Sequence, residues 1–77
     1  MPRYFFDFTD TGESYPDSDG TELPDYESAK IETVQALVEI ARDALCDEDH
    51  RELAFQVRDE TGKPILQVML NFEMLAH

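Results

Sequence analysis

The spacing of the apolar residues changes twice along this chain, and this change constrains the fold more than any other feature. Apolar and polar residues alternate near the N-terminus, and they alternate again from Leu53 to Met74. Between these two regions, apolar residues recur at intervals of three and four. Alternation is the period of a β-strand, whereas the longer interval is the period of an α-helix. The chain therefore predicts strands, then one helix, then strands again.

The first third predicts two strands. Arg3 to Thr9 alternates clearly, and its aromatic residues on one face are Tyr4, Phe6 and Phe8. Thr11-Gly12 indicates a turn. Glu13 to Pro16 is predicted as a short second strand, and Pro16 would confine it to a sheet edge because proline lacks an N–H. The following residues, Asp17 to Gly20, are predicted as a loop.

Asp25 is predicted to cap the N-terminus of a helix that runs to about Leu45 or Cys46. Its apolar arc, which includes Val34, is broad because Ile31 and Val38 lie on the flank between the apolar and polar sides. A small sheet does not normally cover so wide an arc. We therefore expect Ile31 and Val38 to contact a partner, unless the sheet curls around the helix.

The last third predicts a β-hairpin. Leu53 to Arg58 and Lys63 to Met74 alternate, and Asp59-Glu60-Thr61-Gly62 connects them. The expected fold is α+β, with the order β-β-α-β-β and one helix covering one face of a four-stranded sheet. We expect the spatial order 2-1-4-3, because the first and fourth strands carry the densest apolar faces. These two strands would then be parallel. The alternative is a fully antiparallel sheet in the order 2-1-3-4.

The sheet face away from the helix is expected to be partly apolar. Phe5, Ile65 and Met69 are predicted there among polar neighbours. An exposed apolar patch on a small protein is typical of a binding surface. These three residues are therefore the second predicted contact surface, after Ile31 and Val38.

The chain is strongly acidic, with 18 acidic and 6 basic residues and a formal net charge of −12. This charge opposes binding to nucleic acids and to anionic membranes. The stretch from Asp7 to Asp25 holds seven acids and no base. An alternative function is therefore an acidic inhibitor that binds a basic protein in place of nucleic acid. The acidic contact surface would consist of Asp10, Glu13, Asp17, Asp19 and Glu22.

The residues offer little support for catalysis or for a cofactor. Cys46 and His50 form the one nucleophile and base pair worth naming, but the surrounding acids would raise the thiol pKa. We therefore expect no enzymatic activity, no cofactor and no dedicated metal site. A weak Ca²⁺ site at Asp17, Asp19 and Glu22 is a second alternative, although the pattern does not match an EF-hand.

Size and composition predict a single domain over residues 1–77. A lone cysteine excludes an intrachain disulfide and fits a reducing compartment. Neither a signal peptide nor a membrane-length apolar run is recognisable. The expected location is the cytoplasm.

Three segments together resemble a family of short bacterial proteins that are classified only as a domain of unknown function. They are Met1 to Asp7, Asp19 to Asp25 with Ala29 in the helix that follows, and Val57 to Pro64. The resemblance covers almost the whole chain and implies a stand-alone cytoplasmic bacterial protein. It brings no catalytic residues. The acidic loop Cys46 to Asp49 departs from the pattern, in which a less charged turn containing glycine is expected.

Taken together, these features predict a non-enzymatic protein-interaction or regulatory module. Its partner is a protein, including the case of a second copy of the same chain. The half-apolar surfaces and the short chain are the basis of this prediction.

Overall fold

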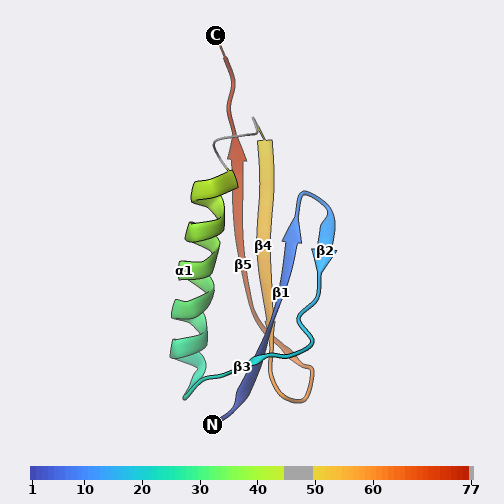
Figure 1. Ribbon diagram of the computed structural model, residues 1–77, viewed down its shortest axis with the longest axis vertical. Coiled ribbons are helices and arrows are strands. Elements are labelled where there is room, and N and C mark those ends of the chain that lie inside the picture. The colour runs from blue at the N-terminus through green and yellow to red at the C-terminus, as the bar shows by residue number, and fades with distance from the viewer. Residues whose placement is uncertain (45–49, 77) are drawn as a thin grey trace.

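The computed structural model describes residues 1–44 and 50–76. In these residues, one helix packs on one face of an antiparallel sheet (Figure 1). The elements in chain order are β1 (Arg3–Asp10), β2 (Glu13–Tyr15), β3 (Thr21–Glu22), α1 (Tyr26–Ala44), β4 (His50–Arg58) and β5 (Pro64–Glu73). This arrangement confirms the predicted α+β class, with the helix between two groups of strands.

The strand order is β2-β1-β4-β5, and the short β3 also pairs with β1. All of these pairs are antiparallel. The favoured prediction, which placed the first and last strands side by side and parallel, is wrong. The fully antiparallel alternative is the order observed.

The position of β4 explains this difference. Leu53 and Val57 of β4 are 1% and 0% exposed, whereas Leu66, Val68 and Leu70 of β5 are only half-buried. The apolar face of β5 is longer, but a short turn keeps β5 beside β4 and leaves it at the sheet edge. The arginines of β4 also bind acidic residues of β1, so opposite charges favour this pairing.

The strand β3 was not predicted, because two residues carry too little pattern to identify a strand. Thr21 lies opposite Tyr4, and the Leu23 N–H donates to the Pro2 carbonyl over 3.0 Å. Gly20 allows this close approach: its φ is +72°, and a Cβ there would lie 2.8 Å from Cγ of Arg3. Only glycine fits such a position without strain.

Both predicted turns are confirmed. Thr11 and Gly12 have φ values of 47° and 91°, as a two-residue hairpin of type I′ requires. In the second turn, Asp59 Oδ1 accepts hydrogen bonds from the N–H groups of Thr61 and Lys63 at 2.9 and 3.0 Å. Asp59 therefore holds together the turn that joins β4 to β5.

The predicted cap of α1 is also confirmed. Asp25 Oδ1 accepts a hydrogen bond from the Ser28 N–H at 2.8 Å, which satisfies a free donor of the first helical turn. The described part of the helix ends at Ala44, so the predicted end at Leu45 or Cys46 lies outside the described residues.

The core lies between α1 and the sheet in two adjoining clusters of buried residues. Small residues of α1 allow the helix to approach the strands closely, and Ala29 is fully buried. The first cluster consists of Leu37, Ala41, Leu53 and Phe55. The second consists of Tyr4, Ala29 and Val57.

Candidate functional site

The acidic stretch is tied to the sheet by a network around Arg58. Arg58 Nε donates to Asp7 Oδ2 at 2.6 Å, and its Nη2 donates to Asp7 Oδ1 and to the Asp17 carbonyl, both at 3.1 Å. The same guanidinium lies 5.0 Å from the centre of the Phe5 ring, within the range of a cation–π contact. This network lies on the sheet face opposite α1, because Phe5, Asp7 and Arg58 alternate with the residues that face the helix.

Asp17 completes the edge of β1 between β2 and β3. Its Oδ2 accepts the Phe6 N–H at 3.1 Å, and its Oδ1 accepts the N–H groups of Asp19 and Gly20, each at 3.1 Å. A neighbouring strand would otherwise bond to the Phe6 N–H, so the carboxylate replaces a missing stretch of strand. Asp17 therefore has a structural role, which its acidic sequence context did not reveal.

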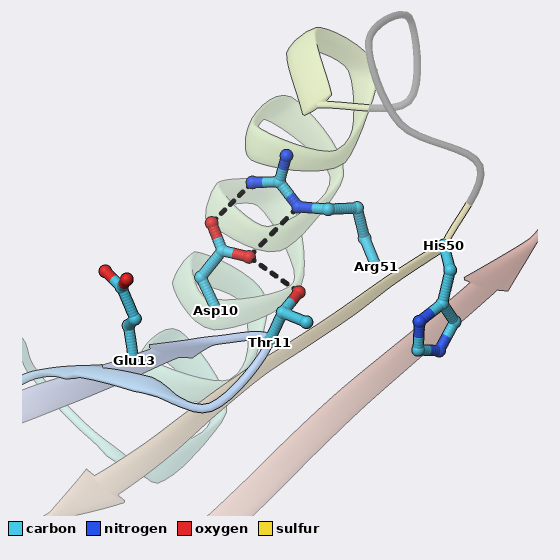
Figure 2. A pocket seen from close by; sticks show the side chains of 5 residues that line it. All are labelled: Asp10, Thr11, Glu13, His50 and Arg51. Carbon is cyan, nitrogen blue, oxygen red and sulfur yellow. Dashed lines mark hydrogen bonds and ion pairs between the residues drawn. The ribbon is translucent and has the colours of Figure 1, made fainter.

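A second ion pair lies at the far end of β1, where Asp10 meets Arg51 of β4 (Figure 2). Arg51 Nε donates to Asp10 Oδ1 at 3.0 Å, and its Nη2 donates to Asp10 Oδ2. Thr11 also donates to Asp10, through its hydroxyl at 3.1 Å. In Figure 2, His50 points to the opposite side of β4 from Arg51. These residues, together with Glu13, line an open hollow of about 250 Å³.

Two of the five acids of the predicted acidic surface form ion pairs within the chain. Asp10 pairs with Arg51, and Glu22 pairs with Arg3 at 3.1 Å. Glu13 accepts a hydrogen bond from the Tyr15 hydroxyl at 2.8 Å. Asp17 lies against β1, and Asp19 is exposed in the loop. The structure does not gather these five acids into one cluster.

These contacts predict a loss of stability at acidic pH. Hydrogen bonds from Arg58 and Arg51 lower the pKa of Asp7 and Asp10. Burial alone would raise the pKa of Asp17, but three backbone donors together outweigh it, so this pKa is also lowered. Their stabilisation is complete above the pKa of the unfolded carboxyl, 3.8, and is lost as pH falls through the folded pKa values. We expect the free energy of unfolding in urea to fall below about pH 4.

The variant Asp7→Asn tests this assignment. Its free energy of unfolding at pH 7 is expected to be lower than that of the wild type. This free energy should also fall less steeply below about pH 4, because one carboxyl with a lowered pKa has been removed. Glu32→Gln, which neutralises an exposed carboxyl on α1, serves as the control. An unchanged pH profile in Asp7→Asn would contradict the role of the Arg58 network.

The outer side of α1 carries an apolar stripe, which we define as Ile31, Val34 and Val38. These side chains are 55%, 44% and 52% exposed, and they follow one another at helical spacing. Val34 was assigned to the apolar arc facing the sheet, but it lies outside the core and joins the two predicted contact residues. A shallow hollow lies along this side of the helix, lined by Val34, Gln35, Val38, Glu39 and Arg42.

The second predicted surface, on the other sheet face, is not continuous. Met69 is 63% exposed there, but Phe5 is half-buried beneath Arg58. Ile65 packs against the core cluster of Tyr4, Ala29 and Val57. The pairing of β4 with β5 shifts its register between Val57 and Arg58, opposite Ile65. This irregularity explains why Ile65 departs from the alternation of inward and outward side chains along β5.

The candidate chemical groups do not assemble into a site in the described part of the chain. Cys46 lies outside the described residues, so its predicted pairing with His50 is not placed. No group of three or more described His, Cys, Asp or Glu residues could hold a metal ion. Within the described residues, no buried side-chain N or O atom lacks a hydrogen-bond partner. No described helix combines the length and the apolar character that are needed to cross a membrane.

The fold and these surfaces define a small α+β protein with one helix on an antiparallel sheet, an acidic segment with three ion pairs to arginines, and an exposed apolar helix side. Comparison with protein families matches residues 3–71 to a domain of unknown function (DUF6894). The chain belongs to this family, which confirms the expectation of a domain of unknown function. Searches of curated proteins and of solved structures each gave no significant match.

Proposed function

We propose that the protein is a non-enzymatic protein-interaction module that binds its partner through the outer side of α1. The exposed stripe of Ile31, Val34 and Val38 is the observation that carries this proposal. Single exposed apolar residues are common on protein surfaces, but a row of three on one helix side is typical of a docking surface. In helix-mediated recognition, such residues at intervals of three and four form the contact.

The stripe contributes little to the fold of a single chain. The core residues of α1, including Leu37 and Ala41, are at most 5% exposed, while every stripe residue is more than 40% exposed. A partner would remove the stripe from water, and this burial would favour association. The contrast supports a role in binding rather than in folding.

The acidic alternative has less support. A nucleic-acid mimic requires unpaired carboxylates, yet Asp10 and Glu22 are bound by arginines and Asp17 holds the edge of β1. The same contacts of Asp17 weaken the proposal of a Ca²⁺ site, because its carboxylate oxygens already accept three backbone hydrogen bonds. With a net charge of −12, we expect no binding to nucleic acid or to anionic membranes. We also propose a cytoplasmic location in a bacterial cell, on the basis of composition and of the three-segment resemblance.

The double variant Ile31→Glu/Val38→Glu tests the proposed function. Its free energy of unfolding is expected to stay within about 0.5 kcal/mol of the wild type, because both side chains are exposed. Proteins that the immobilised wild type captures from a bacterial lysate should no longer bind the variant. Met69→Glu, on the other sheet face, is the matched control and should retain them.

Capture that survives in Ile31→Glu/Val38→Glu would contradict the proposed surface. A large loss of stability in this variant would also contradict it, because the stripe would then belong to the folded core.

A further inference from the structure

The two ends of the stripe carry opposite charges. Glu27 lies one turn before Ile31, and Arg42 lies one turn after Val38. Residues 27, 31, 34, 38 and 42 follow one another at intervals of three and four, so they share one side of the helix. Glu27 and Arg42 are both exposed. From the N-terminal to the C-terminal end of α1, its outer side therefore carries an acidic residue, three apolar residues and a basic residue.

We propose that the occupant of this surface is a second copy of the chain, with the two α1 helices packed antiparallel about a two-fold axis. This proposal rests on the proposed function and names its partner. The axis would pass near Val34 and Gln35, at the middle of the stripe. Ile31 of each chain then faces Val38 of the other, because these positions are equally far from the centre.

Charge complementarity favours this occupant and this direction. Glu27 and Arg42 are also equally far from the centre, so an antiparallel pair places the acid of one chain opposite the base of the other at both ends. A parallel pair would place like charges opposite each other, which is unfavourable. A two-fold interface uses the same patch on both subunits and must be self-complementary, and this stripe meets that requirement.

The net charge of the protein gives the ion pairs a further role. Two chains with a charge of −12 repel each other at long range. Arg42 provides a base at this contact, which also holds the acidic Glu27 and Glu39. At a salt concentration of about 0.15 M, charges more than about 8 Å apart are largely screened, so the contact at the stripe decides the outcome.

The test is the dimer dissociation constant by sedimentation equilibrium at this salt concentration. The wild type is expected to dimerise, and Ile31→Glu/Val38→Glu is expected to weaken the dimer at least about a hundredfold. Glu27→Lys alone places like charges at both ends of the interface and should weaken it about tenfold, and so should Arg42→Glu. The double variant Glu27→Lys/Arg42→Glu restores opposite charges and should recover most of the wild-type affinity. Circular dichroism of each variant checks that the helix is intact.

Three results would overturn the inference. They are a wild type that stays monomeric at every concentration, a dimer that is insensitive to Ile31→Glu/Val38→Glu, and a double charge variant that is no tighter than the single ones. The second result would place the interface elsewhere, for example on the edge strand β5. A monomer that still captures a different protein through the stripe would refute self-association but leave the proposed function standing.

Discussion

Leu53→Ala is expected to lower the free energy of unfolding by about 3 kcal/mol, one of the largest effects of any single substitution in this chain. Leu53 is 1% exposed and packs in the core cluster with Leu37, Ala41 and Phe55. A domain of this size has a total stability of only about 4–11 kcal/mol, so the loss would be a large part of it. Urea unfolding followed by circular dichroism measures the change.

Leu70→Ala is the matched control for this prediction. Leu70 lies directly opposite Leu53 in the ladder between β4 and β5, but it is only half-buried. Leu70→Ala should lower the free energy of unfolding by roughly half as much as Leu53→Ala does, because it removes less buried apolar surface and leaves a smaller cavity. An equal or larger loss in Leu70→Ala would contradict the central position of β4 in the sheet.

Asp17→Ala is expected to cost about 2 kcal/mol, although this residue lies in an acidic loop that reads as solvent-exposed. The substitution removes the acceptor for the N–H groups of Phe6, Asp19 and Gly20. A hydrogen bond to a charged group contributes up to about 3 kcal/mol, but water reaches this loop and reduces the total. The effect should appear in the same urea unfolding experiment.

Asp19→Ala, two residues further along, removes the same charge from the same loop. Among the described residues, no hydrogen bond to the Asp19 carboxylate is observed. This variant should therefore change the stability by less than about 0.5 kcal/mol. If both variants had the same effect, the net charge of the loop would be the cause rather than the specific bonds of Asp17.

Local patterns in the sequence predicted most of the elements. The aromatic alternation in β1, the cap at Asp25 and the glycine turn at Gly62 each depend on neighbouring residues, and each is confirmed. The strand order depends on contacts between distant residues. The pairing of Asp7 with Arg58, 51 positions apart, favours β4 beside β1, and it is visible only once the strands are aligned.

The candidate surfaces were predictable to different degrees. Ile31 and Val38 lie on the flank of a helical pattern, and the structure places both at an exposed position. Val34 was assigned to the core arc because a helical wheel does not show how narrow a sheet the helix covers. The role of Asp17 could not be predicted, because an acid that replaces a strand has no pattern of its own. A run of acids without bases gave no sign that arginines from β1 and β4 would form ion pairs with Asp7, Asp10 and Glu22.

Methyl NMR spectra recorded over a dilution series test whether the protein associates with a second copy of itself through the outer side of α1. The methyl signals of Ile31, Val34 and Val38 are expected to shift with concentration, while those of the buried Leu53 and Val57 stay constant. Shifts centred on Met69, or spectra that do not change with concentration, would contradict self-association through this helix surface.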